Sequence, residues 1–114
     1  AAGQPMVDAY LTHRPNLLGL VLIIDIRRDP QEEERNLAQW LISHDMPYLV
    51  VLTKADKLSK NRQQKRAALI SSQMNRTAGE LIVFSAKTRL GRETILDEIN
   101  NLITWHEQFG EETD

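Results

Sequence analysis

The sequence contains no cysteine, which excludes disulfide bridges, thiolate metal sites and a cysteine nucleophile. It also lacks a long hydrophobic run, because the longest one, residues 17–24, is interrupted by Gly19. A membrane-spanning helix needs about 20 apolar residues, and the first residues lack the build of a signal peptide. We therefore expect a cytoplasmic protein in a reducing compartment. The chain begins at Ala1 without a methionine, which suggests a part of a longer protein.

The chain has no strong excess of charge of either sign. Its 14 Lys and Arg residues and 16 Asp and Glu residues give a net charge of -2, with a pI of about 5.9. This balance gives no overall electrostatic case for binding nucleic acid or an anionic membrane, although it leaves local basic patches open. The basic run at residues 60–66 predicts either a solvated helix face or a contact with phosphate-rich RNA.

The hydrophobic pattern predicts one small α/β domain with no second domain. The 114 residues are 41% hydrophobic and 26% charged, which is ordinary for a soluble globular protein. Short apolar runs separated by amphipathic segments imply parallel strands joined by helices, in three α/β/α layers. Three such strands make half of a doubly wound domain. The expected strands are residues 17–24, 47–52 and 81–84, and the expected helices are residues 5–14, 30–44, 58–76 and a C-terminal segment from about residue 95.

The polar stretch Thr53-Lys54-Ala55-Asp56 directly follows the central expected strand, where open parallel sheets place ligand sites. A carboxylate at Asp56 could accept hydrogen bonds from both N1-H and the amino group of guanine. Adenine offers no such pair of donors, so a site of this kind discriminates strongly against it. Lys54 could lay its methylene stem along the plane of the base. These four residues are equally compatible with an ordinary polar exit from a strand.

A second loop, Ser85-Ala86-Lys87, follows the next expected strand at the same edge of the sheet. The two motifs in this order, each after a buried strand, resemble the base-recognition loops of P-loop GTPases. In that superfamily the small residue of the second loop lets the backbone close on the base. The resemblance implies that Thr53, Lys54 and Asp56 read guanine, and that Ser85, Ala86 and Lys87 close the other side.

Over residues 4–105 the chain resembles the C-terminal half of the EngB-type bacterial GTP-binding proteins. The similarity rests on the two loops, on Asp25 and Arg27 after the first strand, and on the Pro5–Leu17 segment. The resemblance implies binding of GTP and GDP with Mg²⁺, slow GTP hydrolysis, and a role in large ribosomal subunit assembly and cell division. Asp25 and Arg27 match the family, and we expect them to have a structural role.

The departures from the family pattern concern the phosphate groups. The sequence has no Gly-x-x-x-x-Gly-Lys-Ser/Thr loop, no Asp-x-x-Gly stretch before the first strand, and no counterpart of the family's Mg²⁺-binding threonine. We therefore expect no GTP hydrolysis by these 114 residues alone. We also expect the strand at residues 20–24 to be an exposed edge, because its family partner strand is missing. Such an edge predicts a dimer or a swapped oligomer.

Two other interpretations of the loops stay open. The chain could be a non-enzymatic α/β module that binds a protein or RNA through its basic run and its exposed edge. A flavodoxin-like or receiver domain is a weaker alternative, supported only by Asp25 and Asp29. The three histidines, His13, His44 and His106, show no metal-binding spacing.

Overall fold

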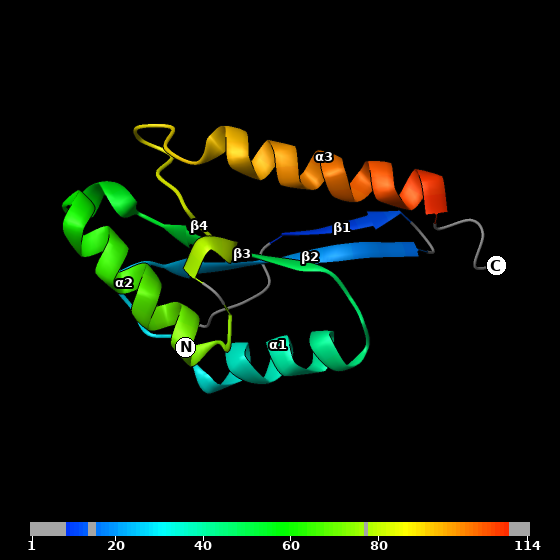
Figure 1. Ribbon diagram of the computed structural model, residues 1–114, viewed down its shortest axis with the longest axis horizontal. Coiled ribbons are helices and arrows are strands. Elements are labelled where there is room, and N and C mark those ends of the chain that lie inside the picture. Colours follow the sequence, from blue (N-terminus) through cyan, green and yellow to red (C-terminus); the bar gives the residue numbers. More distant parts are fainter. Residues whose placement is uncertain (1–8, 14–15, 77, 110–114) are drawn as a thin grey trace.

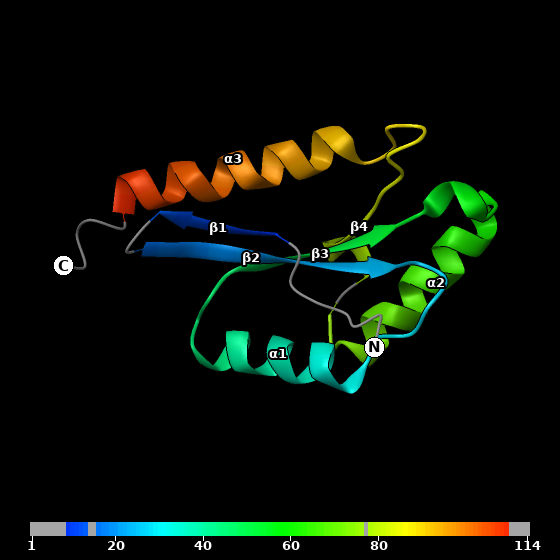
Figure 2. The ribbon, with the colours of Figure 1, turned by 180° about the vertical axis from the view of Figure 1, so that it is seen from behind.

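The computed structural model describes residues 9–13, 16–76 and 78–109. Its centre is a four-stranded sheet in the order β1-β2-β3-β4. Helix α3 covers one face of this sheet, and helices α1 and α2 cover the other (Figures 1 and 2). The helices are α1 Glu32–Ser43, α2 Lys60–Gln73 and α3 Arg92–Phe109, with short 3₁₀ turns η1 Ala55–Lys57 and η2 Ala78–Glu80.

Three strands of the sheet are parallel, as the sequence predicts. Strand β2 (Asn16–Asp25) pairs with β3 (Tyr48–Thr53), and β3 pairs with β4 (Leu81–Val83). The α/β architecture with parallel strands and flanking helices is therefore confirmed. Parallel pairing brings the carboxyl ends of all three strands to one edge of the sheet, where the loops after β2, β3 and β4 meet.

The N-terminal segment corrects two expectations. Residues 9–13 of the expected helix form strand β1 (Ala9–His13), which runs antiparallel to β2, while the remainder of that helix lies outside the described residues. Of the expected exposed edge at residues 20–24, Leu20 and Val21 are therefore paired, with Tyr10 and Ala9 of β1. The pairing continues from there to His13↔Asn16. Backbone groups at a sheet edge need partners, and pairing with β2 overrides the helical pattern. The premise of the predicted dimer is therefore wrong for Leu20 and Val21, and the dimer itself stays a prediction.

The larger of two hydrophobic clusters lies between the sheet and the α1 and α2 layer. Alternate side chains of a strand point to opposite faces, so Leu22 and Ile24 of β2 enter this cluster while Val21 enters the smaller one beneath α3. The larger cluster also receives the buried residues Leu41 of α1 and Ile70 of α2. It fixes α2 against the strand ends and so fixes the loop that precedes α2.

Helix boundaries follow from local capping, whereas helical spacing alone does not decide which apolar residues are buried. Ser59 caps α2, with its hydroxyl accepting from the Arg62 N–H at 3.2 Å. Leu69 is 44% exposed and Trp40 is 50% exposed, although their spacing predicts burial. Only one stripe of each helix meets the sheet, and both residues lie beyond its margin. Within the described ranges, no helix is long and apolar enough to cross a membrane.

Candidate functional site

The loops after β3 and β4 are joined by backbone hydrogen bonds that extend past the ends of the strands. The Phe84 N–H donates to the Leu52 carbonyl at 2.8 Å, and the Ala55 N–H donates to the Phe84 carbonyl at 3.1 Å. Ala55 is fully buried. The two predicted loops are therefore neighbours in space and are held in a defined register.

Lys54 turns the chain sharply out of β3. Its backbone is left-handed, with φ 64° and ψ 31°, which is uncommon for a residue with a side chain. Its carbonyl accepts from the Lys57 N–H at 3.0 Å and closes η1. Gln63 of α2 braces this turn by donating to the carbonyls of Ala55 and Leu58 at 2.8 and 3.1 Å. The turn places Asp56 toward the loop after β4.

Asp56 and Ser85 meet directly. The Ser85 hydroxyl donates to Asp56 Oδ1 at 2.8 Å, across 29 residues of sequence. This hydrogen bond is the main cause that holds the pKa of Asp56 below its usual value, with smaller contributions from the charges of Lys57 and Lys87. The carboxylate is therefore ionised at neutral pH and fixed in orientation by one of its oxygens.

Ser85 organises its own loop as well. Its side chain is fully buried, and its Oγ accepts from the Thr88 N–H at 3.1 Å while donating to Asp56. Its backbone N–H donates to the Leu90 carbonyl at 3.1 Å. The loop ends at Gly91, whose φ is +81° and where a Cβ would collide with the Val83 carbonyl oxygen. This tight path positions Ser85 beneath the surface at the carboxyl ends of β2, β3 and β4, which we call the rim of the sheet.

A cavity of about 360 Å³ opens beside the second loop and is lined by Phe84, Ala86, Arg89 and Arg92. It contains one predicted site residue, Ala86, whereas Lys54 and Asp56 are not among its lining residues. A larger cavity, about 640 Å³, lies at the opposite ends of β3 and β4 and includes Tyr48, Ile82 and Leu102. The sequence analysis did not predict that Arg89 and Arg92 line a cavity. The only indication in the sequence was that both residues follow Ser85 within a few positions.

The remaining predicted residues lie around this rim. The Thr53 hydroxyl is 3.5 Å from the Ile24 carbonyl of β2, a long contact that directs it toward the neighbouring strand. Lys87 is exposed, and its charge reaches Asp56. The charge of Lys54 acts on Asp25, which lies opposite Thr53 in the strand register. The structure thus brings Asp56, Ser85 and Lys87 together, with Lys54 nearer the loop after β2.

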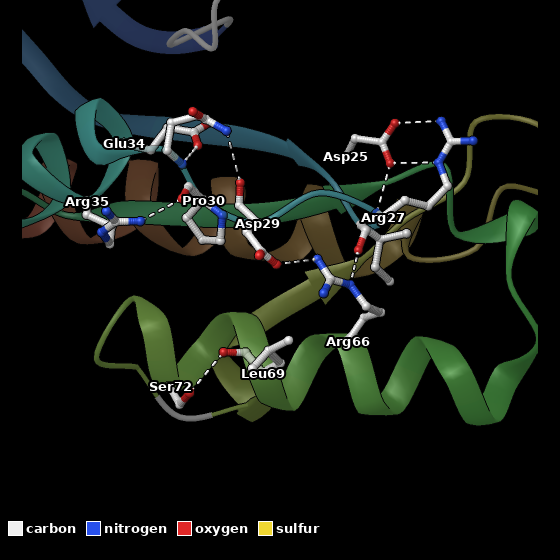
Figure 3. A network of polar contacts seen from close by, with 11 residues as sticks. Asp25, Arg27, Asp29, Pro30, Glu34, Arg35, Arg66, Leu69 and Ser72 are labelled. Carbon is white, nitrogen blue, oxygen red and sulfur yellow. Dashed lines mark hydrogen bonds and ion pairs between the residues drawn. The ribbon is translucent and has the colours of Figure 1, made fainter.

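The loop after β2 forms a separate polar network (Figure 3). Asp25 is bound by its neighbour Arg27, which donates to Oδ1 from Nε at 3.0 Å and to Oδ2 from Nη2 at 2.7 Å. Arg66 of α2 reaches across to donate to the Ile26 carbonyl at 2.7 Å and pairs with Asp29 at 3.1 Å. Arg66 belongs to the basic run, and its structural contact was not predictable from charge alone.

The residues at this rim do not fit a metal site. Within residues 9–13, 16–76 and 78–109, no group of three or more His, Cys, Asp or Glu side chains could hold a metal ion. The resemblance implies Mg²⁺, but the present acids, Asp25 and Asp56, are each engaged by another side chain. None of the residues that the structure describes is therefore assigned to Mg²⁺.

The chain matches the family described as "Elongation factor Tu GTP binding domain" over residues 16–104. A protein of Desulforapulum autotrophicum named "Probable GTP-binding protein EngB" is 48% identical over 99 residues, which are 87% of this chain and 51% of that protein. A protein of the same name from Geobacter metallireducens is 41% identical over 109 residues, 96% of this chain and 53% of that protein. The chain therefore spans about half the length of the curated relatives it matches.

A solved structure supports the fold independently. Translation elongation factor SelB from Methanococcus maripaludis, in its apo form, superposes with a TM-score of 0.54. The match covers 78% of this chain and 20% of that chain at 23% sequence identity. At this identity the similarity concerns the fold alone.

Proposed function

Because this chain belongs to the elongation factor Tu GTP-binding domain family of P-loop GTPases, we propose that it supplies the guanine-recognition part of a GTPase. The observation that carries the proposal is the 2.8 Å hydrogen bond from Ser85 to Asp56. It fixes an ionised carboxylate at the point where the two rim loops meet. In this role Asp56 reads the edge of the base, and Lys54 and Thr53 support it.

The chemistry of the carboxylate suits guanine. An ionised carboxylate has about four lone-pair positions, and Ser85 occupies one of them on Oδ1. The carboxylate can still accept N1-H and the exocyclic amino group side by side. Adenine would place an acceptor opposite the same oxygens and leave the charge unpaired, which is unfavourable. Ala86 and Lys87 would close the opposite side of the base.

The phosphate chemistry belongs to residues that this sequence does not contain. There is no Gly-x-x-x-x-Gly-Lys-Ser/Thr stretch among the 114 residues, and backbone N–H groups of such a loop are what cradle the phosphates. These residues alone should bind GDP weakly and hydrolyse no GTP. For the whole protein we propose GTP hydrolysis with Mg²⁺ and, from the EngB resemblance, a role in large ribosomal subunit assembly and cell division.

The test is a nucleotide titration of the isotopically labelled chain followed by NMR. Millimolar GDP should shift the amide signals of Asp56, Ser85, Ala86 and Lys87, and ADP should shift them far less. Equal shifts with ADP would contradict guanine recognition. Shifts confined to Tyr48, Ile82 and Leu102 would place the ligand in the larger cavity and would equally contradict the proposal. Measurable GTP turnover by the pure chain would contradict the assignment of catalysis elsewhere.

A further inference from the structure

Gln63 lies near the start of α2, and its side chain leaves the helix to contact the turn that carries Asp56. Its Nε2 donates to the carbonyls of Ala55 and Leu58, at 2.8 and 3.1 Å. These two carbonyls lie at the start of η1 and directly after it. One amide group therefore connects the two ends of the turn and attaches both of them to α2.

The turn that Gln63 contacts contains a backbone conformation that is unfavourable for a residue with a side chain. Lys54 has φ 64° and ψ 31°, a left-handed geometry that brings its Cβ close to the following carbonyl oxygen. A residue keeps such a conformation only where the surrounding contacts enforce it. The backbone bond from the Lys57 N–H to the Lys54 carbonyl closes the turn from within, at 3.0 Å. The Gln63 amide adds two hydrogen bonds from outside the turn.

The side chain of Gln63 is not needed to start the helix. Ser59 caps α2 through its hydroxyl, which accepts from the Arg62 N–H at 3.2 Å. A backbone bond runs from the Gln63 N–H to the Ser59 carbonyl at 2.8 Å. Both bonds use groups that remain when the Gln63 side chain is changed. The next residue, Gln64, is exposed, whereas Gln63 is partly buried against the turn.

We propose that Gln63 is a positioning residue for guanine recognition, because it holds the turn that directs the carboxylate of Asp56 at the base. The inference rests on the proposed function, since the orientation of Asp56 matters only if Asp56 reads guanine. Ser85 fixes Asp56 Oδ1 from the loop after β4, and Gln63 fixes the backbone from the side of α2. Guanine presents two donors side by side, so both carboxylate oxygens have to be placed together.

Three variants of the whole protein test whether the hydrogen bonds of Gln63 have this role. Gln63→Met keeps a side chain of similar length and a good helix former but removes the amide. Gln63→Lys restores a donor, because an ammonium group can donate to both carbonyls. Gln64→Met is the matched control, since it makes the same chemical change at the exposed neighbouring glutamine.

The affinities of the whole protein for GDP and for inosine diphosphate are compared by calorimetry. Inosine diphosphate lacks the exocyclic amino group of guanine, so the ratio of the two affinities reports whether Asp56 accepts both donors. We expect Gln63→Met to bind GDP about tenfold more weakly, because two carbonyls lose their donor and the turn loosens. The ratio should fall toward one. Gln63→Lys should recover most of the ratio, and Gln64→Met should keep the wild-type values.

A second measurement is independent of the nucleotide. The Lys57 and Leu58 N–H groups close the turn by donating to the Lys54 and Ala55 carbonyls, each at 3.0 Å. Without added nucleotide, these two amides should exchange their hydrogens about tenfold faster in Gln63→Met, because the turn opens locally more often. The amide of Ile70, farther along α2, should exchange at the wild-type rate.

Four results would overturn the positioning role. They are an unchanged affinity ratio in Gln63→Met, unchanged exchange of the two turn amides, equal effects in Gln64→Met, and equal losses of the ratio in Gln63→Met and Gln63→Lys. If the wild-type protein prefers GDP to ADP while Gln63→Met keeps the ratio, the positioning proposal fails alone. If the turn amides exchange faster in Gln63→Met but the wild-type protein binds GDP and ADP equally, guanine recognition fails and the hold of Gln63 on the turn remains.

Discussion

Two aspartates lie at the same edge of the sheet, and their surroundings differ in one respect. Asp25 ends β2 and accepts three hydrogen bonds from Arg27, one from its backbone N–H at 2.9 Å and two from its side chain at 3.0 and 2.7 Å. Asp56 follows β3 and accepts one side-chain bond, from Ser85. The pKa is lowered in both, chiefly by Arg27 at Asp25 and by Ser85 at Asp56.

The difference shows how one chain holds two kinds of carboxylate. We call Asp25 the closed acid, because a side chain bonds both of its oxygens, and Asp56 the available acid, because a side chain bonds only one. Arg27 is two residues from Asp25, and its planar guanidinium covers both carboxylate oxygens. Ser85 comes from another strand and offers one hydroxyl, so it orients Asp56 without saturating it. A ligand with two adjacent donors can therefore engage Asp56, whereas at Asp25 it would have to displace a guanidinium. The predictions below test this distinction in order of decreasing expected effect.

The largest effect should come from Asp56→Asn. The amide replaces one acceptor oxygen by a donor that opposes N1-H or the amino group of guanine, so the preference for GDP over ADP should collapse, by up to about 10⁴-fold in a well-formed site. Competition titrations of the whole protein with both nucleotides measure this ratio, because the 114 residues alone should bind GDP weakly. The matched control is Asp25→Asn, which makes the same chemical change at the closed acid and should alter the ratio less than about twofold. Equal losses in both variants would remove the distinction.

A smaller effect should come from Ser85→Ala. The change leaves the Thr88 N–H without its partner and frees the Asp56 carboxylate to rotate. Losing a hydrogen bond to a charged group costs about 1.5–3 kcal/mol, so the GDP affinity of the whole protein should fall about 10- to 100-fold. Ser72→Ala is the control, since that exposed hydroxyl donates only to the Leu69 carbonyl one helical turn away. Wild-type affinity in Ser85→Ala would show that orientation of Asp56 is unimportant.

The smallest effect is a pH dependence that separates the two acids. Both carboxyl pKa values are lower in the folded chain than the usual value near 4. The stabilisation they provide is therefore present above that value and is lost as the pH falls through the folded pKa. Carboxyl carbon chemical shifts should titrate at a higher pH for Asp56 in Ser85→Ala, and for Asp25 in Arg27→Gln. A joint shift of both acids in either variant would show that they titrate as one unit.

The sequence predicts the parts of this site that depend on neighbouring residues. The strand ends, the Ser59 cap and the placement of two loops at one rim all follow from patterns within a few residues. What it could not predict involves contacts between distant segments. Residues 9–13 form β1 because their backbone groups pair with the edge of β2. Leu69 is exposed because α2 contacts the sheet along a narrower stripe than the spacing of its apolar residues suggests.

The cavity beside Ala86 was unpredictable for the same reason. Its lining combines Phe84, which directly follows β4, with the next loop and Arg92, the first residue of α3. A sequence pattern marks each of these segments but gives no distance between them. The expected convergence of Lys54, Asp56 and Ala86 on one pocket stays a prediction, which the GDP titration above addresses.

The bond from Arg66 to Ile26 has a consequence for the order of folding. The two residues are 40 positions apart, and closing so long a loop is entropically unfavourable until other contacts hold its ends together. The connection that carries Asp25 and Arg27 can therefore gain its contact with Arg66 only after α2 has docked on the strands. A nascent chain that ends before α2 would hold this connection through the Ile26 N–H bond to the Thr53 carbonyl at 2.9 Å, but would lack the second anchor that Arg66 supplies.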